Sequence, residues 1–303
     1  MDIKRVKVLL SAYNGEKYIE EQIESILNQS YKSIELYIRD DGSKDHTPEI
    51  LQKYEGDDRI HVLMGENVGF IKSFFALIKD CGDADYFAFA DQDDVWLPDK
   101  ISMALEKLEA EAEGEPLLYF SNYDYYDGEM RFKEHGRKPT LEPSFRNALV
   151  DCMTLGFNSV FNKAAHDIML EHIPEYSCGH DWWTYMICSG MGKVVYDDRV
   201  TVKYRRTGDN VSPGGMGFLK FQVWRFKKFF VNDYFANVRK QLQEFYRLYA
   251  DKLKEEDLKL LRLFSKEKYH LGTALKKVFY PKRFRCGIMD EMFVRFIFLI
   301  GKL

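Results

Sequence analysis

The sequence predicts an α/β fold whose centre is a doubly wound, mostly parallel sheet, followed by a C-terminal helical appendage. Strand-like apolar runs alternate with segments of helical periodicity through residues 1–100. This alternation is typical of parallel sheets that carry helices on both faces. Polar side chains follow the ends of four runs, where the ligands of such sheets bind. From about residue 217 onward the periodicity is helical.

Four strands are expected in the first third of the chain. They cover 6–12, 34–38, 60–64 and 86–90, and the expected helices cover 16–28, 47–54, 71–79 and 101–112. The run 86–90 contains no polar residue or turn signal, which predicts a strand buried on both faces. Pro48 at the first helical position favours a helix start there.

The second part of the predicted sheet is less regular. Strands are expected over 117–120, 160–161, 193–196 and 200–204, with helices over 164–171 and from 180 to about 188. The polar segment 128–146 reads as a loop. Pro213-Gly-Gly215 marks a boundary, so we expect a domain over 1–212, with halves 1–100 and 101–212, and a helical region over 213–303.

Composition excludes several classes of protein. A net charge of −4 argues against a nucleic-acid binder, which would be strongly basic. Five widely spaced cysteines without a CxxC pair predict neither a disulfide framework nor a zinc site. The sequence begins with a strand pattern instead of a signal peptide, and no apolar run is long enough to span a membrane. We therefore expect a cytoplasmic protein, with membrane contact limited to peripheral binding at the inner face of the cell membrane.

Three acids follow the buried run 86–90 directly: Asp91, Asp93 and Asp94, with Gln92 among them. Like charges at close range raise one another's pKa. A hard divalent cation such as Mg²⁺ or Mn²⁺ removes that cost, because it takes carboxylate oxygens together with substrate phosphates. A solvated acidic loop is the alternative, but the position after a buried strand favours a metal site.

Polar residues also follow the other three strands. Ser11, Tyr13 and Asn14 follow the first strand, Asp40 and Asp41 the second, and Asn67 and Gly69 the third. The stretch Asp40-Asp41-Gly42-Ser43 could equally be a turn with a helix cap, since these are common turn residues. Asn67 and Gly69 could equally belong to an ordinary loop.

Taken together these motifs resemble the family 2 glycosyltransferases, which have the GT-A fold. The resemblance covers about 1–212 and includes Ser11-Ala-Tyr13-Asn14, Asp40-Asp41-Gly42-Ser43, Asn67-x-Gly69, Asp91-x-Asp93-Asp94 and His180-Asp181-Trp182. The forms Ala90-Asp-Gln-Asp-Asp-Val-Trp96, Gly179-His-Asp-Trp-Trp183 and Tyr204-Arg205-Arg206 are most similar to bacterial rhamnosyltransferase-type enzymes that build surface polysaccharides.

The resemblance implies an inverting transferase. Its donor would be a dTDP- or UDP-sugar, with dTDP-rhamnose favoured, and its acceptor a hydroxyl of a bacterial glycan, such as a lipid-linked one. Residues 1–100 would bind the nucleotide-sugar and 101–212 the acceptor. A non-catalytic partner that binds nucleotide-sugar in an assembly is the alternative. A Mg²⁺-dependent phosphatase is disfavoured, because its nucleophile would end the first strand, where Ser-Ala-Tyr-Asn stands.

The resemblance also implies residue roles. Ser11, Tyr13 and Asn14 would contact the nucleotide, and Asp41 would accept from the N3–H of uracil or thymine. The other predicted contacts to the nucleotide-sugar are Asn67, Gly69, Asp91, Gln92 and Asp94, with Asp94 at the sugar end. Asp93 would hold the metal, Mn²⁺ or Mg²⁺, with Asp91 as a second ligand or a ligand to its water.

Asp181 is the predicted general base, which takes the proton of the attacking hydroxyl. Flanking tryptophans would raise its pKa, whereas the helix N-terminus would lower it. The alternative is an aspartate that caps a helix beginning with two core tryptophans, Trp182 and Trp183. His180 beside them reads as a packed histidine.

One position departs from the family pattern. Rhamnosyltransferase-like relatives commonly have Tyr-Arg-x-His, and here Thr207 stands at the histidine position. A hydroxyl is a poor replacement for imidazole as a ligand, so Arg205 or Arg206 would supply charge to the phosphates.

Two C-terminal stretches, 218–240 and 281–303, mix bulky apolar residues with Lys and Arg. Basic amphipathic segments of this kind bind anionic membrane surfaces. The alternatives are that they pack on the catalytic domain, or on a second copy in a homo-oligomer.

Overall fold

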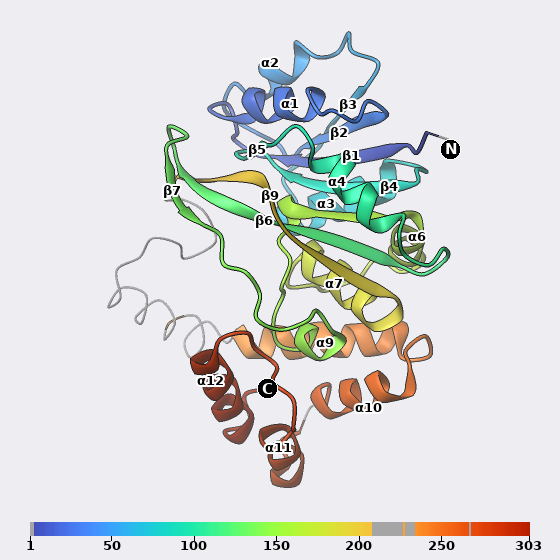
Figure 1. Ribbon diagram of the computed structural model, residues 1–303, viewed down its shortest axis with the longest axis vertical. Coiled ribbons are helices and arrows are strands. Elements are labelled where there is room, and N and C mark those ends of the chain that lie inside the picture. The colour runs from blue at the N-terminus through green and yellow to red at the C-terminus, as the bar shows by residue number, and fades with distance from the viewer. Residues whose placement is uncertain (1–2, 208–226, 228–233, 267) are drawn as a thin grey trace.

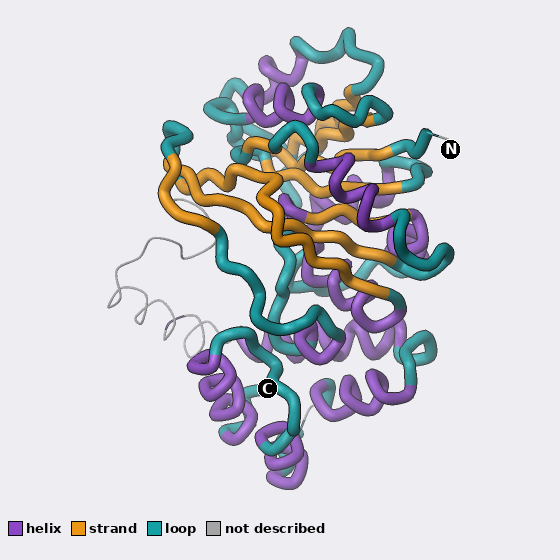
Figure 2. Tube along the Cα trace, in the orientation of Figure 1, coloured by secondary structure: helices purple, strands orange, loops and turns teal. Residues whose placement is uncertain are grey.

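The fold was examined in a computed structural model that describes residues 3–207, 227, 234–266 and 268–303. Among these residues nine strands form one sheet, in the order β3-β2-β1-β4-β8-β6-β9-β5, with β7 paired to β6. Helices cover the sheet, and further helices form the end of the molecule opposite α1 and α2 (Figures 1 and 2).

The first half follows the predicted alternation closely. The strands β1 (Val6–Ala12), β2 (Ile34–Asp40), β3 (Ile60–Met64) and β4 (Tyr86–Asp91) pair in parallel. The helices between and after them are α1 (Ile19–Leu27), α2 (Thr47–Gln52), α3 (Phe70–Asp80) and α4 (Lys100–Leu108). Their apolar sides pack on opposite faces of the sheet, with α1, α2 and α4 on one face and α3 on the other. Successive side chains of β1 alternate between these two cores.

The second half extends the same sheet. β8 (Ser159–Asn162) lies antiparallel between β4 and β6 (Leu117–Asp127), and β6 runs parallel to β9 (Lys193–Arg206). The two strands predicted over 193–196 and 200–204 are thus one strand. Between them Arg199 Nε donates to the buried Asp197 Oδ2 at 2.8 Å, and the pairing of β9 with β6 shifts register at this point. The short strand β5 (Val95–Trp96) was not predicted and pairs antiparallel with β9.

The segment 128–146 is not only a loop. It contains β7 (Phe132–His135), which forms a hairpin with β6, and the short helix α5 (Phe145–Ala148). All four residues of β7 are exposed, so the strand has no buried face and leaves no alternating pattern in the sequence.

The second half also supplies α6 (Lys163–Glu171), α7 (His180–Met191) and the short 3₁₀ turn η1 (Gly156–Asn158). The chain ends in α9 (Tyr234–Tyr249), α10 (Glu255–Phe264), α11 (Leu271–Val278) and α12 (Ile288–Leu299). Within the described ranges no helix is both long and apolar enough to cross a bilayer.

The C-terminal helices share a hydrophobic core with the sheet. One cluster of buried side chains includes Phe87 of β4, Trp183 of α7, Phe245 of α9 and Phe298 of α12. The ring centroids of Trp183 and Phe245 lie 5.3 Å apart. Packing on the catalytic part, one of the three alternatives for this region, is therefore present for α9. The predicted boundary at 212/213 and most of 218–240 fall outside the described residues.

Candidate active site

The carboxyl ends of β1 and β4 lie side by side and hold the first loop of the site. In the strand register Ser11 of β1 lies between Arg39 of β2 and Asp91 of β4. Just beyond, the Gln92 side chain accepts from Tyr13 N at 2.8 Å and donates to Tyr13 O at 3.0 Å. The Tyr13 main chain is thus fixed, while its ring remains 42% exposed at the edge of the sheet.

Gly15 lies directly against the Gln92 side chain. A Cβ on Gly15 would lie 2.4 Å from Gln92 Oε1, closer than two such atoms can approach. A bulkier residue at position 15 would therefore displace Gln92. The motif Tyr13-Asn14-Gly15 and the motif Asp91-Gln92-Asp93 are thus parts of one structure, although they lie far apart in the sequence.

Asn14 joins the first loop to the second. Its main chain takes a left-handed conformation, with φ of 49°, which asparagine tolerates better than most residues. Asn14 N donates to Ser43 Oγ at 2.8 Å, and Lys44 N donates to Asn14 Oδ1 at 2.8 Å. Asp40 in turn accepts from Ser43 N at 3.1 Å. The turn interpretation of this second motif therefore holds for Asp40.

Asp41 holds the third loop. Its buried carboxylate pairs with Arg39 and accepts from Val68 N at 3.0 Å and from Gly69 N at 2.9 Å. Asn67 and Gly69 themselves are exposed at the edge of the site. A carboxylate offers about four lone-pair positions, so these three donors leave Asp41 able to accept from a nucleobase. That contact stays a prediction.

A buried polar network behind these loops was not predicted. Ser11 Oγ and Ser73 Oγ lie 2.6 Å apart, and Arg39 Nη1 donates to Ser73 Oγ at 3.1 Å. Arg39 Nη2 also donates to Glu66 O at 3.0 Å. Ser73 lies within α3 and Arg39 within β2, so no local pattern distinguishes them from ordinary residues of those elements.

The three acids after β4 are electrostatically costly, as the sequence predicts. Burial, followed by the charges of Asp93 and Asp181, raises the pKa of Asp91 to about 7. Burial also raises the pKa of Asp93. Burial and the neighbouring Asp93 and Asp91 hold the pKa of Asp94 well above its usual value. Asp94 Oδ1 accepts from Arg205 N at 3.0 Å, whereas Asp94 Oδ2 has no hydrogen-bond partner among the described residues.

These acids fit a divalent cation. Two carboxylates that are hard to charge can be charged when a cation neutralises them. In the described part of the chain no three His, Cys, Asp or Glu side chains converge into a complete metal site. A Mg²⁺ or Mn²⁺ ion held by one or two carboxylates would complete its shell with substrate phosphates and water. Asp93 and Asp91 are the residues that would hold it.

Asp181 lies in the first turn of α7. Gly179 precedes the helix as its N-cap residue, and a Cβ there would lie 2.5 Å from Asp181 Oδ1. Asp181 Oδ1 accepts from Trp182 N at 2.8 Å. Burial raises the pKa of Asp181 to about 6, against the lowering effect of main-chain N–H groups. The carboxylate is thus held in place and tuned toward neutral pH.

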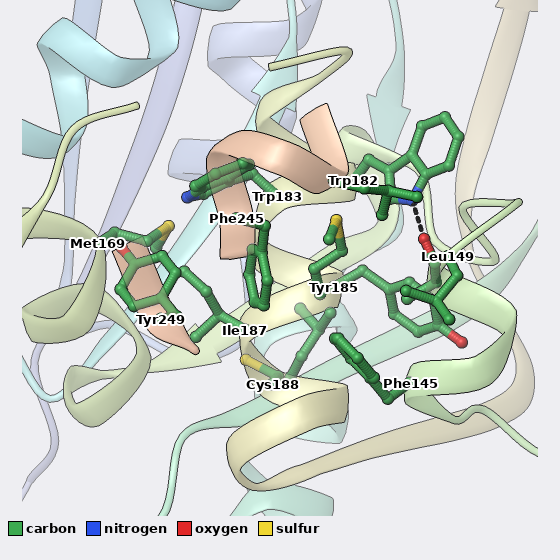
Figure 3. Close-up of a cluster of buried hydrophobic side chains, with 14 of the residues drawn as sticks. Phe145, Leu149, Met169, Trp182, Trp183, Tyr185, Ile187, Cys188, Phe245 and Tyr249 are labelled. Atoms are coloured by element: carbon green, nitrogen blue, oxygen red, sulfur yellow. Dashed lines mark hydrogen bonds between the residues drawn. The ribbon is translucent and has the colours of Figure 1, made fainter. Parts of the chain in front are cut away.

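The two tryptophans after Asp181 belong to the core, as the alternative reading of this motif predicts. Trp183 is fully buried against α9, and Trp182 Nε1 donates to Ala148 O at 2.7 Å (Figure 3). The same reading made Asp181 the helix cap, but Gly179 occupies that position. The tryptophans therefore anchor α7, and Asp181 stays at its open end.

Asp91 and Asp181 share one site. They come from the end of β4 and the start of α7, and the charge of Asp181 is one of the causes that raise the pKa of Asp91. Like charges act on each other's pKa in this way when they lie in the same poorly solvated region. The predicted metal ligand Asp91 and the predicted base Asp181 therefore belong to the same site.

His180 is packed among aromatic rings, as predicted, but the hydrogen-bonding capacity of its ring nitrogens is unused within the described residues. Its ring stacks on Phe74, with centroids 3.7 Å apart, and meets Phe89 edge-on at 4.6 Å. Neither ring nitrogen has a hydrogen-bond partner within the described residues. Burial lowers its pKa to about 3, so the ring is neutral and cannot serve as a cation for phosphate.

Arg205 is a connecting residue in this conformation. Its guanidinium donates to Asp93 O at 2.7 Å and to Gly128 O at 2.9 Å, and it pairs with Glu21. Arg206 lies over the Tyr125 ring and donates to Glu134 Oε1 at 3.0 Å. Thr207 follows the end of β9 and is partly exposed. Contacts of Arg205 and Arg206 to phosphate stay predictions.

Gln22 is a site residue that the sequence did not reveal. Its side chain is buried in α1, and its Nε2 donates to the main-chain oxygen of Asp91 at 3.0 Å. It therefore fixes the main chain where the acids begin. A polar residue on the buried side of α1 was the available signal, since Ile19, Ile23 and Ile26 are buried around it.

Comparison with known proteins places this geometry among related enzymes. The family model described as "Glycosyl transferase family 2" matches residues 7–173. The chain is 29% identical over 230 residues to dTDP-rhamnosyl transferase RfbG of Shigella flexneri, covering 69% of this chain and 75% of RfbG.

Solved structures share the fold. TarS 1-349 of S. aureus in complex with UDP-GlcNAc aligns with a TM-score of 0.57 at 13% identity, covering 89% of this chain and 83% of that one. Mannosyltransferase PcManGT from Pyrobaculum calidifontis in complex with GDP-Man and Mn²⁺ aligns with a TM-score of 0.51 at 14% identity, covering 86% and 69%. These likenesses confirm the predicted GT-A fold with C-terminal helices.

Proposed function

The chain belongs to glycosyl transferase family 2, and we propose that it moves a sugar, with inversion, from a dTDP- or UDP-sugar to a hydroxyl of a bacterial surface glycan. The observation that carries the proposal is the placement of two acids, Asp91 at the carboxyl end of β4 and Asp181 in the first turn of α7, where burial raises the pKa of both. One carboxylate belongs to the motif that would face the diphosphate, and the other would face the acceptor.

The donor would lie along the carboxyl ends of β1 to β4. The exposed Tyr13 ring would stack on the base, Asp41 would accept from its N3–H, and Asn67 would border it. dTDP-rhamnose is the favoured sugar donor, supported by the likeness to dTDP-rhamnosyl transferase RfbG. UDP-hexoses are the next candidates.

Asp181 would act on the acceptor. The hydroxyl oxygen forms a bond to the anomeric carbon, the bond from that carbon to the diphosphate oxygen breaks, and the hydroxyl proton passes to Asp181. A pKa of about 6 leaves this carboxylate mostly charged at neutral pH and still basic enough to take a proton. Attack from the face opposite the diphosphate inverts the anomeric centre.

The leaving diphosphate carries the developing charge. A divalent cation held by Asp93 and Asp91 would neutralise that charge when bound. Gln22 and Gln92 keep the main chain around these acids in place, through Asp91 O and Tyr13. Residues 1–100 would form the donor half, 101–212 the acceptor half and 213–303 a C-terminal helical region that contacts a membrane surface or a second copy of the chain.

A donor screen tests this proposal directly. Purified protein is offered UDP- and dTDP-sugars with Mn²⁺ or Mg²⁺, and release of the nucleoside diphosphate is measured. We expect slow hydrolysis of one donor, loss of that activity in Asp93→Ala, and retained activity in the matched control Asp198→Asn, an exposed acid on β9. Turnover that is equal with and without a divalent cation would contradict the metal role.

A non-catalytic partner that binds nucleotide-sugar is the second candidate. It is favoured by Thr207 at the position where relatives commonly have histidine. Calorimetry with the same donors, repeated with candidate acceptors, separates the two functions. Donor binding without turnover for every acceptor would support the partner, and neither binding nor turnover would reject both.

A further inference from the structure

The helices α9, α11 and α12 lie together at one end of the molecule (Figure 1). A pocket whose wall includes four cations lies among them. It is a small hollow of about 20 Å³ that is partly open to solvent. The basic side chains in its wall are Arg239, Lys266, Lys268 and Lys277, with His270 beside them.

Lys277 is the buried cation of this pocket, and its Nζ lies 4.7 Å from the centre of the Phe264 ring. Lys277 is only 6% exposed. Burial, followed by the charges of Arg239 and Lys266, lowers its pKa to about 8. Arg239 donates to a main-chain oxygen, Gly301 O, at 2.9 Å. A buried ammonium among other cations is costly unless an anion joins them, so the pocket has the chemistry of a phosphate site.

The surface around the pocket is apolar. Ten of the eighteen large apolar side chains that are exposed in the described residues lie between 269 and 300. On α11 and its end they are Leu271, Leu275 and Phe279, and on α12 and its end Ile288, Met289, Met292, Phe296, Leu299 and Ile300. Their spacing of three and four residues forms a stripe on each helix. Tyr269 links pocket and stripe, because it lines the pocket and its hydroxyl donates to Leu299 O at 3.0 Å.

We propose that α11 and α12 lie on an anionic membrane surface and that the pocket between them and α9 holds a lipid phosphate group. The charge of the region supports a lipid over a second copy of the chain. Residues 266–303 contain nine Lys or Arg and three Asp or Glu, whereas the whole chain has a net charge of −4. A symmetric dimer through this patch would place the cations against themselves.

The binding mode is peripheral. Within the described ranges no helix is long and apolar enough to span a membrane, so the apolar stripes would enter only the headgroup boundary. The proposal needs neither donor nor acceptor and therefore stands apart from the proposed transfer reaction.

Sedimentation with vesicles tests the proposal. The full chain, tagged at its N-terminus because Leu303 lines the pocket, is mixed with phosphatidylcholine vesicles that contain or lack phosphatidylglycerol. We expect binding to the anionic vesicles that is at least about tenfold tighter than to the neutral ones, since each nearby cation contributes roughly a fivefold gain.

Three variants separate the parts of the surface. Lys266→Gln/Lys268→Gln changes two exposed cations and should weaken binding to anionic vesicles roughly 25-fold. Lys277→Met removes the buried cation and should weaken that binding roughly fivefold. Met289→Gln/Met292→Gln should weaken binding to both kinds of vesicle. The matched control Lys79→Gln/Lys259→Gln changes exposed lysines on α3 and α10 and should bind as the wild type does.

Several outcomes would overturn the proposal. One is equal loss in the pocket variants and the control, which would indicate bulk charge alone. Another is stabilisation by inorganic pyrophosphate without any vesicle binding, which would assign the pocket to a free anion. A dimer that Met289→Gln/Met292→Gln dissociates, without vesicle binding, would assign the stripe to a second copy. The Asp181→Asn protein should bind vesicles as the wild type does. The vesicle experiment therefore tests membrane binding even if the proposed transfer reaction is not observed.

Discussion

Like charges crowd together at two places in this molecule. At the end of β4 and the start of α7 they are carboxylates, Asp91, Asp93, Asp94 and Asp181, whose pKa values are raised. Between α9, α11 and α12 they are cations, and the pKa of Lys277 among them is lowered. Each group is costly to charge by itself, and each therefore favours a partner of opposite sign.

The two places differ in how their charges are held. Main-chain groups and strand register fix the acids, as in the bonds from Gln22 to Asp91 O and from Trp182 N to Asp181. The cations reach their pocket on long side chains from helices and from a connecting segment. Rigid positioning serves a reaction, in which misplacement by about 1 Å can cost a hundredfold in rate. Flexible side chains suffice to gather charge against a surface.

The largest expected effect is on Asp181. Asp181→Asn should lower kcat about 10³-fold, because proton transfer by a positioned base commonly contributes 10²–10⁴. Donor affinity, measured by calorimetry, should stay within about threefold. A parallel fall of donor affinity and kcat would instead make Asp181 part of the donor site.

The pH dependence of the reaction gives a second test of Asp181 as the general base. A base must be deprotonated to act, and the pKa of Asp181 is about 6. With saturating metal, kcat/KM should be level at higher pH and fall about tenfold per unit as pH drops below 6. A level profile down to about pH 4 would mean that no acid with a raised pKa limits the reaction.

The variant Asp91→Asn tests whether the buried acids at the end of β4 destabilise the fold when no cation is bound. Its pKa of about 7 in the folded chain exceeds the usual aspartate value of 3.8, so the folded state binds this proton more tightly than the unfolded one. Stability therefore falls as pH rises from about 4 to 7. In chelator at about pH 7.5, Asp91→Asn should stabilise the fold by roughly 1–2 kcal/mol in urea unfolding, and near pH 4 the gain should vanish.

The metal gives the control for this variant. Mn²⁺ should raise the unfolding midpoint of the wild type more than that of Asp91→Asn, and Asp198→Asn should behave as the wild type does. Equal midpoints for all three proteins at every pH would show that the acids are not strained.

The smallest expected effect concerns the cation pocket. Lys277 has a pKa of about 8 in the folded chain, below the usual 10.5, so its penalty is present below pH 8 and fades as pH rises toward the value of the unfolded chain. Lys277→Met should stabilise the protein by about 1 kcal/mol near neutral pH. Urea unfolding measures this, with the exposed Lys79→Met as control, and destabilisation by Lys277→Met would contradict it.

The group of acids at the end of β4 could be predicted from the sequence far better than the pocket of cations between α9, α11 and α12. Buried strands leave continuous apolar runs, and the residues directly after them must meet at one edge of a parallel sheet. Asp91 and Ser11 were placed together on that ground, and the register confirms it. The pocket brings together Arg239, Lys266 and Lys277 from three separate elements, and nothing in the local pattern says how those helices pack.

Within the site the same limit applies. The pairing of Arg39 with Asp41 and Ser73, and that of Gln92 with Tyr13, are tertiary contacts. The exposed strand β7 was missed because it buries no face. Asp181 was recognised through its motif, since an aspartate before two tryptophans equally suggests a helix cap over a core.

The packing of α7 on α9 bears on how the protein is made. The strands β1 to β4 use residues synthesised early, but one face of their sheet packs in the same core as α7 and α9. The helix that carries Asp181 buries Trp183 against Phe245 and Tyr249, which are synthesised much later. The base therefore gains its final support only after α9 has emerged, and a nascent chain that stops before α9 would expose an aromatic face to chaperones.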